Sequence, residues 1–114
     1  MPRREVLLVG EMIDAAEQAQ RLAGDHDLDE FRSDRVLRDA LLWNFTVLGE
    51  AASQLSDAFK SSHPDLDWAR PSQLRNRIVH GYWSIDLGIL HSTALDDLPE
   101  FVIHLRSVLD QLEA

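Results

Sequence analysis

The segment from residue 34 to residue 59 restricts the possible folds of this 114-residue chain more than any other. Its mostly apolar residues recur every three or four positions, which is the period of a buried helical stripe. The stripe comprises Leu37, Leu41, Asn44, Leu48, Ala51 and Leu55, and is widened by Val36, Ala40, Val47 and Phe59. We therefore expect one long helix, from Ser33 or Asp34 to Phe59, that contacts several neighbours or forms a dimer face.

The rest of the chain also favours helices, because glycine and proline are scarce, at five and four, and strand-like alternation is absent. We expect helices over about residues 4–22 and 98–112, a short turn over 28–31, a helix that carries residues 75–82, and a helix capped by Asp86. Pro71 fits the first turn of the helix that carries residues 75–82. Pro99 must break or kink the helical chain near Leu98. Residues 61–67 read as a loop. The sequence predicts one all-α domain over 1–114, an up-and-down bundle of four to five helices.

The charge balance limits how the protein can meet nucleic acid. Twenty acidic residues against eleven basic ones give a net charge of −9, which argues against electrostatic coating of a duplex. A local basic site remains possible, since Arg70, Arg75 and Arg77 lie within eight residues, and the acidic remainder suits a basic protein partner. The sequence contains no cysteine and no signal-peptide pattern, and no apolar run approaches the roughly 20 residues of a membrane span. We therefore expect a cytoplasmic protein without a membrane partner.

Residues 75–82 gather two guanidiniums, a carboxamide, an imidazole and a phenol. Helical neighbours are about 100° apart, so Asn76 and His80 share a face and the amide can orient the imidazole by a hydrogen bond. Arg77 also adjoins His80, whereas Arg75 is about 140° from it. Either the long arginine side chain or a dimer that pairs two such helices would close that gap. A cluster of this kind can also serve only to stabilise the end of a helix.

The chain resembles the HEPN superfamily, and within it the HepT-like toxins, from about residue 6 to residue 109. The family pairs such toxins with a minimal nucleotidyltransferase, MntA, in type VII toxin–antitoxin systems. The resemblance is carried by Arg38-Asp39-Ala40-Leu41-Leu42-Trp43-Asn44-Phe45, Leu48-Gly49-Glu50-Ala51-Ala52, His63-Pro64-Asp65 with Trp68, Arg75-Asn76-Arg77-Ile78-Val79-His80-Gly81-Tyr82, Asp86-Leu87 and Asp97-Leu98-Pro99. Four main blocks in this order are far more specific than an Arg/His pair alone.

The resemblance implies a homodimeric, metal-independent endoribonuclease without a cofactor, with its active site at the dimer interface. His80 would remove the 2′-hydroxyl proton of RNA, Arg75 would neutralise the phosphate, and Asn76 would orient the imidazole. It also implies that Tyr82 is the residue to which a cognate MntA-like antitoxin transfers AMP. The added bulk and charge would block RNA and compete for Arg75. Tyr82 has a structural alternative, as an aromatic cap on the bundle.

Other polar residues offer less. Glu50 lies within an apolar stripe, where it pairs either with an active-site arginine or with a surface charge. Asp97 opens a possible capping box, and the remaining histidines have no metal-ligand spacing. We expect Trp43 and Trp68 to be core or interface residues. Two further readings stay open: a catalytically inactive HEPN module that binds a nucleotide or a protein, and a purely structural dimerisation bundle.

Overall fold

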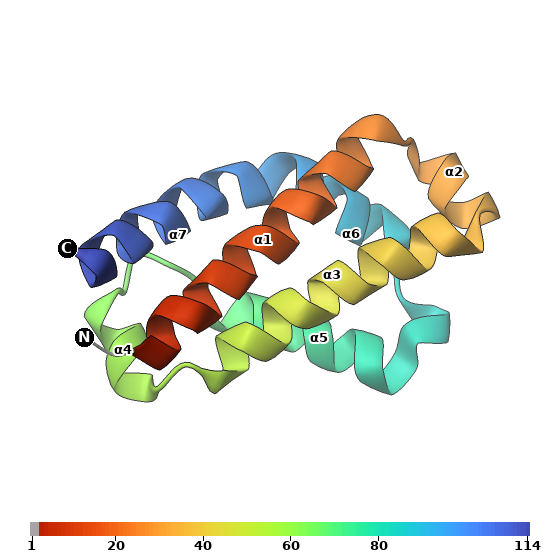
Figure 1. The fold of residues 1–114 in the computed structure, drawn as a ribbon. Coiled ribbons are helices and arrows are strands. Elements are labelled where there is room, and N and C mark those ends of the chain that lie inside the picture. The colour runs from red at the N-terminus through yellow and green to blue at the C-terminus, as the bar shows by residue number, and fades with distance from the viewer. Residues whose placement is uncertain (1–2) are drawn as a thin grey trace.

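The computed structural model describes residues 3–114, which form helices joined by short connections (Figure 1). No strand occurs in this part of the chain, so the all-α prediction is confirmed. A 3₁₀ turn at Tyr82–Ser84 follows α5, and a π-helical segment at Thr93–Asp97 joins α6 to α7. The helices are α1 Arg3–Asp25, α2 Leu28–Ser33, α3 Arg35–Gln54, α4 Asp57–Ser62, α5 Ala69–Gly81, α6 Leu87–Ser92 and α7 Leu98–Glu113.

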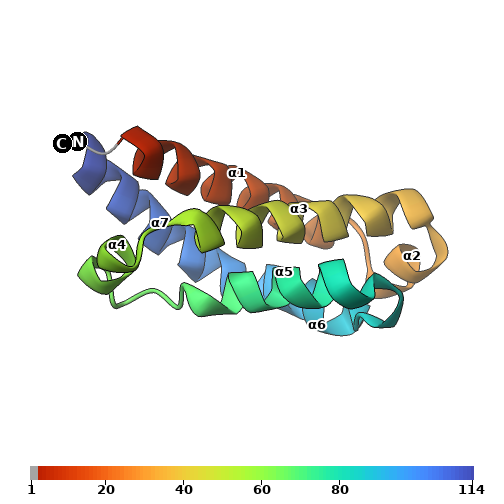
Figure 2. The same cartoon turned by 90° about the horizontal axis from the view of Figure 1, so that it is seen from below.

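Helix α3 is the centre of the bundle. It packs against α1 on one side and against α5 on the other, and α7 packs against α1. Figure 2 shows α3 between α1 and α5, with the start of α1 and the end of α7 at the same end of the molecule. The buried face of α3 includes Leu41, Phe45, Leu48 and Ala52, so the apolar spacing identified the core face correctly.

The predicted helix over residues 34–59 is wrong only over its last five residues, because α3 ends at Gln54. Leu55 is extended, with φ −68° and ψ 140°, and Ser56 begins a separate short helix by accepting a hydrogen bond from the Phe59 N–H at 3.1 Å. Leu55 and Phe59 are nevertheless both buried. The apolar pattern therefore continues across a break that only the capping serine marks. The following loop begins after Ser62.

The two predicted caps near the C-terminal half have opposite outcomes. Asp86 caps α6 as predicted, and its carboxylate accepts from the N–H groups of Gly88 at 2.9 Å and Ile89 at 3.3 Å. The capping box at Asp97 is wrong: its side chain makes no capping hydrogen bond, because the backbone is already helical on its N-terminal side. The carboxylate instead lies 3.1 Å from Nη2 of Arg70 on α5. Helix α7 still begins at Leu98, as expected.

Candidate active site

Gly49 sets the position of α5 on α3. A methyl group at this position would overlap the Cβ of Arg75 and the carbonyl oxygen of Pro71. Ser72 on the same turn donates to the Gly49 carbonyl at 3.5 Å. Only a glycine allows the two helix backbones to approach so closely, and this approach brings Arg75 directly beside α3. Gly49 therefore sets how closely α5 packs on α3.

Arg75 is half-buried and held on both sides. Its Nη2 lies 3.1 Å from Glu50 Oε2 on α3, and its Nη1 donates to the carboxamide oxygen of Asn76 at 2.7 Å. Its Nε–H is buried and has no hydrogen-bond partner within residues 3–114. Glu50 is thus the partner of the candidate active-site arginine, which was one of its two possible roles. A carboxylate and a carboxamide together fix the plane of the guanidinium.

His80 lies exposed in the last turn of α5. Its imidazole makes no hydrogen bond to any described residue, because the Asn76 oxygen that could have oriented it is bonded to Arg75. Asn76 is exposed as well. The monomer therefore presents an unrestrained imidazole to solvent, about 140° around the helix from the restrained guanidinium of Arg75.

Tyr82 lies just beyond α5, in the 3₁₀ turn, and 61% of it is exposed. Its ring meets that of Trp83 edge to face, with centroids 5.2 Å apart, and Trp83 is exposed as well. An aromatic that capped the bundle would be buried, so this alternative for Tyr82 is not what the structure contains. The phenol lies two residues from His80 and is accessible from solvent.

An apolar groove lies between α1, α3 and α5 on the face that carries Arg75. Trp43 on α3 and Val79 on α5 line it, and they are 66% and 46% exposed. Arg75 and Glu50 lie in the same groove. Trp43 is therefore a surface residue, unlike the buried Trp68. We call this surface the Trp43 groove; its apolar lining is Leu8, Trp43, Val47, Ala51 and Val79.

The three arginines near this site do not form one basic pocket. Arg70 pairs with Asp97 on the side of the π-helical segment, and Arg75 pairs with Glu50 on the side of α3. Arg77 is exposed and makes no ion pair with any residue that the structure describes. The sequence placed them within eight residues, but on an α-helix position 75 points about 140–160° away from positions 70 and 77, which lie only about 20° apart.

The cluster around Arg70 was not predicted from the sequence. Besides Asp97, its Nη2 lies 3.5 Å from the hydroxyl of Thr93, a buried residue of the π-helical segment, and its backbone N–H donates to Asp67 at 3.1 Å. These residues border an apolar cavity that Phe45 and Phe101 also line. No local sequence signal marks a π-helical insertion, so periodicity could not predict this arrangement.

Within residues 3–114, no group of three His, Asp or Glu side chains is arranged to hold a metal ion. None of the helices described above is both long and apolar enough to cross a membrane.

The structure thus combines an all-α bundle, an arginine fixed against the central helix α3 and an exposed histidine in the last turn of α5. The model of the Ribonuclease HepT-like family matches residues 12–108, and the chain belongs to this family. Its HEPN relationship, expected from the four sequence blocks, is thereby confirmed.

Individual relatives are distant but cover most of the chain. A protein of Thermococcus cleftensis named "Probable ribonuclease HepT" is 24% identical over 78% of this chain and 81% of its own. A protein of Methanocaldococcus jannaschii named "Putative RNase MJ1380" is 26% identical over 88% of this chain and 93% of its own. No solved structure matches the chain significantly.

Proposed function

We propose that this protein is a metal-independent RNA endonuclease. The observation that carries the proposal is the exposed His80 imidazole on the helix that also holds the restrained guanidinium of Arg75, in a chain of the Ribonuclease HepT-like family. The names of the relatives, which refer to ribonucleases, support the same activity. An imidazole with a free pKa near 6.5 can accept and return a proton at neutral pH.

The reaction proceeds by internal transesterification. His80 removes the proton of the 2′-hydroxyl, the 2′-oxygen attacks phosphorus, and the bond from phosphorus to the 5′-oxygen breaks. The leaving 5′-oxygen takes a proton from an acid, which is either His80 of the partner subunit or a water. Arg75 neutralises the charge on the non-bridging oxygens in the transition state. The need for a 2′-hydroxyl restricts the substrate to RNA.

The site is completed by a second copy of the chain. Arg75 and Val79 lie in the Trp43 groove, whose apolar side chains have no cover in the monomer, and His80 follows Val79 directly. A twofold axis through this groove would bury Trp43 and bring each Arg75 toward His80 of the partner subunit. The pairing would also account for the separation of Arg75 and His80 around one helix.

Tyr82 is the proposed point of control. Its phenol is exposed two residues after His80, so a nucleotidyltransferase antitoxin can reach it. Transfer of AMP from ATP to the phenol oxygen forms a phosphodiester and releases pyrophosphate. The added phosphate then competes with RNA for the guanidinium of Arg75, and the nucleoside covers the imidazole. The protein would thus be the toxin of a toxin–antitoxin pair.

The experiment is cleavage of a 5′-labelled single-stranded RNA by purified protein in EDTA. Wild type should give fragments that end in a 2′,3′-cyclic phosphate, and His80→Ala should lower the rate by about 10²–10⁴-fold. His104→Ala, a change of a half-buried histidine on α7, is the matched control and should cleave like wild type. Undiminished cleavage by His80→Ala, or loss of wild-type activity in EDTA, would show that this mechanism is wrong.

A further inference from the structure

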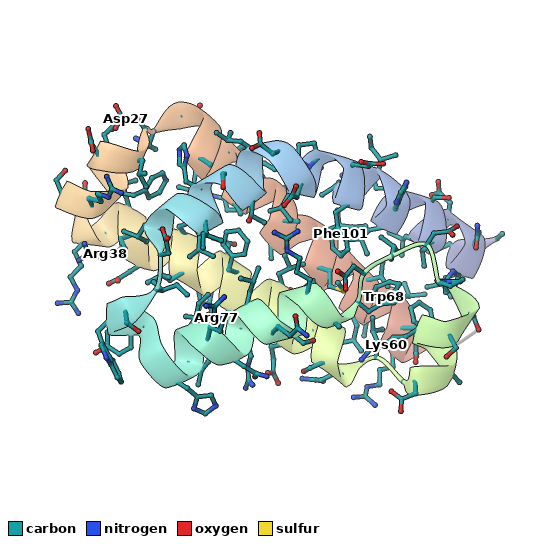
Figure 3. All side chains as sticks on the ribbon, turned by 180° about the vertical axis from the view of Figure 1, so that it is seen from behind. Asp27, Arg38, Lys60, Trp68, Arg77 and Phe101 are labelled. Carbon is teal, nitrogen blue, oxygen red and sulfur yellow. The ribbon has the colours of Figure 1, made fainter. Side chains whose placement is uncertain are left out.

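A groove runs between α5 and α6, on the side of α5 away from the Trp43 groove. Two cavities meet there, and they share three lining residues: Leu74 and Arg77 of α5 and Ile89 of α6. One cavity continues toward the end of α5 at Gly81, and the other continues back along the helix toward Arg70. Figure 3 looks onto this face and labels Arg77 on α5. We call this surface the α5–α6 groove.

The guanidinium of Arg77 forms no ion pair with a described residue, although the carboxylate of Asp67 lies on the same groove lining. The other guanidinium on its lining, that of Arg70, lies 3.1 Å from the carboxylate of Asp97. Asp86, at the opposite end, uses a carboxylate oxygen to accept the Gly88 and Ile89 N–H groups. The guanidinium of Arg77 has no ion pair or hydrogen bond to any side chain that the structure describes. A cation left unpaired in a groove of a protein with net charge −9 is a candidate anion-binding group.

The position of Arg77 relates this groove to the candidate active site. Arg77 precedes His80 by three residues, so the two side chains are neighbours on the helix surface, about 4.5 Å apart along its axis. Arg75 points toward α3, about 160° around the helix from Arg77. The two arginines therefore cannot grip the same phosphate from one protomer, and Arg77 has access to a different one.

We infer that Arg77 binds a backbone phosphate next to the scissile one, in a single-stranded RNA that lies along the α5–α6 groove. This inference rests on the proposed ribonuclease function and assigns Arg77 to substrate positioning. Gln73 and Asn76 border the same groove and are exposed, so their amides can meet sugar or base edges of the strand. Single-stranded RNA is favoured over duplex because a groove between two helices admits one backbone, with the flanking bases free.

The test measures binding and catalysis separately. Binding of a fluorescein-labelled single-stranded RNA is followed by anisotropy between about 50 and about 400 mM salt, in the His80→Ala background, which prevents cleavage during the titration. Arg77→Gln should weaken binding roughly two- to tenfold at low salt and reduce the slope of log affinity against log salt by about 0.7 for each Arg77 that contacts the strand. In the active protein the same change should raise KM by a similar factor and leave kcat nearly unchanged.

Arg21→Gln is the matched control, because Arg21 is an exposed arginine on α1 that makes no ion pair with a described residue. It removes the same charge and should leave the salt slope and KM at their wild-type values. Arg77→Lys retains the charge and should restore the slope. Circular dichroism confirms that each variant is folded, as expected for exposed positions.

Two results would overturn the inference. In the first, Arg77→Gln binds RNA with the same salt slope as Arg21→Gln. In the second, Arg77→Gln lowers kcat while KM and the salt slope stay constant. Absence of RNA cleavage by wild type would contradict the proposed function instead, and the anisotropy experiment would still report whether Arg77 contacts RNA.

Discussion

Replacement of Gly49 by alanine should separate the central packing contact from the chemistry that depends on it. The added methyl would overlap the Arg75 Cβ and the Pro71 carbonyl oxygen, and neither atom is the end of a flexible side chain. Overpacking of this kind typically costs about 1–3 kcal/mol, and rigid neighbours place Gly49→Ala near the upper limit. Alanine recovers roughly 1 kcal/mol of helix propensity. The free energy of unfolding should therefore fall by about 2 kcal/mol.

Thermal unfolding followed by circular dichroism, at one fixed protein concentration, measures this change. A loss of ~2 kcal/mol corresponds to a Tm lower by roughly 8 °C for a domain of this size. Gly10→Ala is the matched control: Gly10 also lies within a helix, but a methyl group there would meet no atom within 4 Å. This variant should gain about 0.5–1 kcal/mol.

The same variant tests the connection to the candidate active site. Because Arg75 contacts α3 directly beside Gly49, a shift of α5 should also break the ion pair with Glu50 and lower RNA cleavage. Gly10→Ala should cleave RNA like wild type. If Gly49→Ala unfolds at the temperature of Gly10→Ala, the close approach of α3 and α5 does not have the role described here.

Three further variants test the remaining steps. Glu50→Gln should change the free energy of unfolding by less than about 1 kcal/mol, since the ion pair is partly exposed. It should lower kcat, because Arg75 loses the carboxylate that positions it, and an unchanged kcat would show that Glu50 has no role in the site. Trp43→Glu should give a mass near 13.0 kDa by light scattering, where wild type should give twice that; two equal masses would exclude the Trp43 groove as the interface. Tyr82→Phe should remain an active nuclease yet gain no mass from a cognate nucleotidyltransferase with ATP; full modification of the variant would exclude Tyr82 as the acceptor.

The sequence predicted the class of fold and most helix positions because the apolar period is a local property. It missed the end of α3, since the apolar stripe continues through Leu55 and Phe59 while the backbone turns extended at Leu55. Ser56 was the available signal, as a capping residue followed three positions later by a buried aromatic. Local patterns identify which side chains are buried more reliably than they identify where a helix ends.

The candidate site was predictable in its residues and less so in their partners. The position of Arg75 next to Glu50 depends on how α3 and α5 cross, which a single sequence restricts only through the glycine at position 49. The position of Arg75 on a different side of α5 from Arg70 and Arg77 follows from helix geometry and could have been predicted. The pairing of Arg70 with Asp97 could not, because it depends on a π-helical segment with no sequence signature.

The most direct test of the account is complementation between two inactive chains. Arg75→Ala and His80→Ala chains, each with a different affinity tag, are co-expressed, and the mixed dimers are isolated by both tags. One of the two clefts built from both protomers retains one Arg75 and one His80 in the mixed dimer, so RNA cleavage should recover at least about tenfold above either mutant homodimer. If the mixed dimer is as inactive as the two homodimers, Arg75 and His80 do not act across an interface, and the composite site proposed here is contradicted.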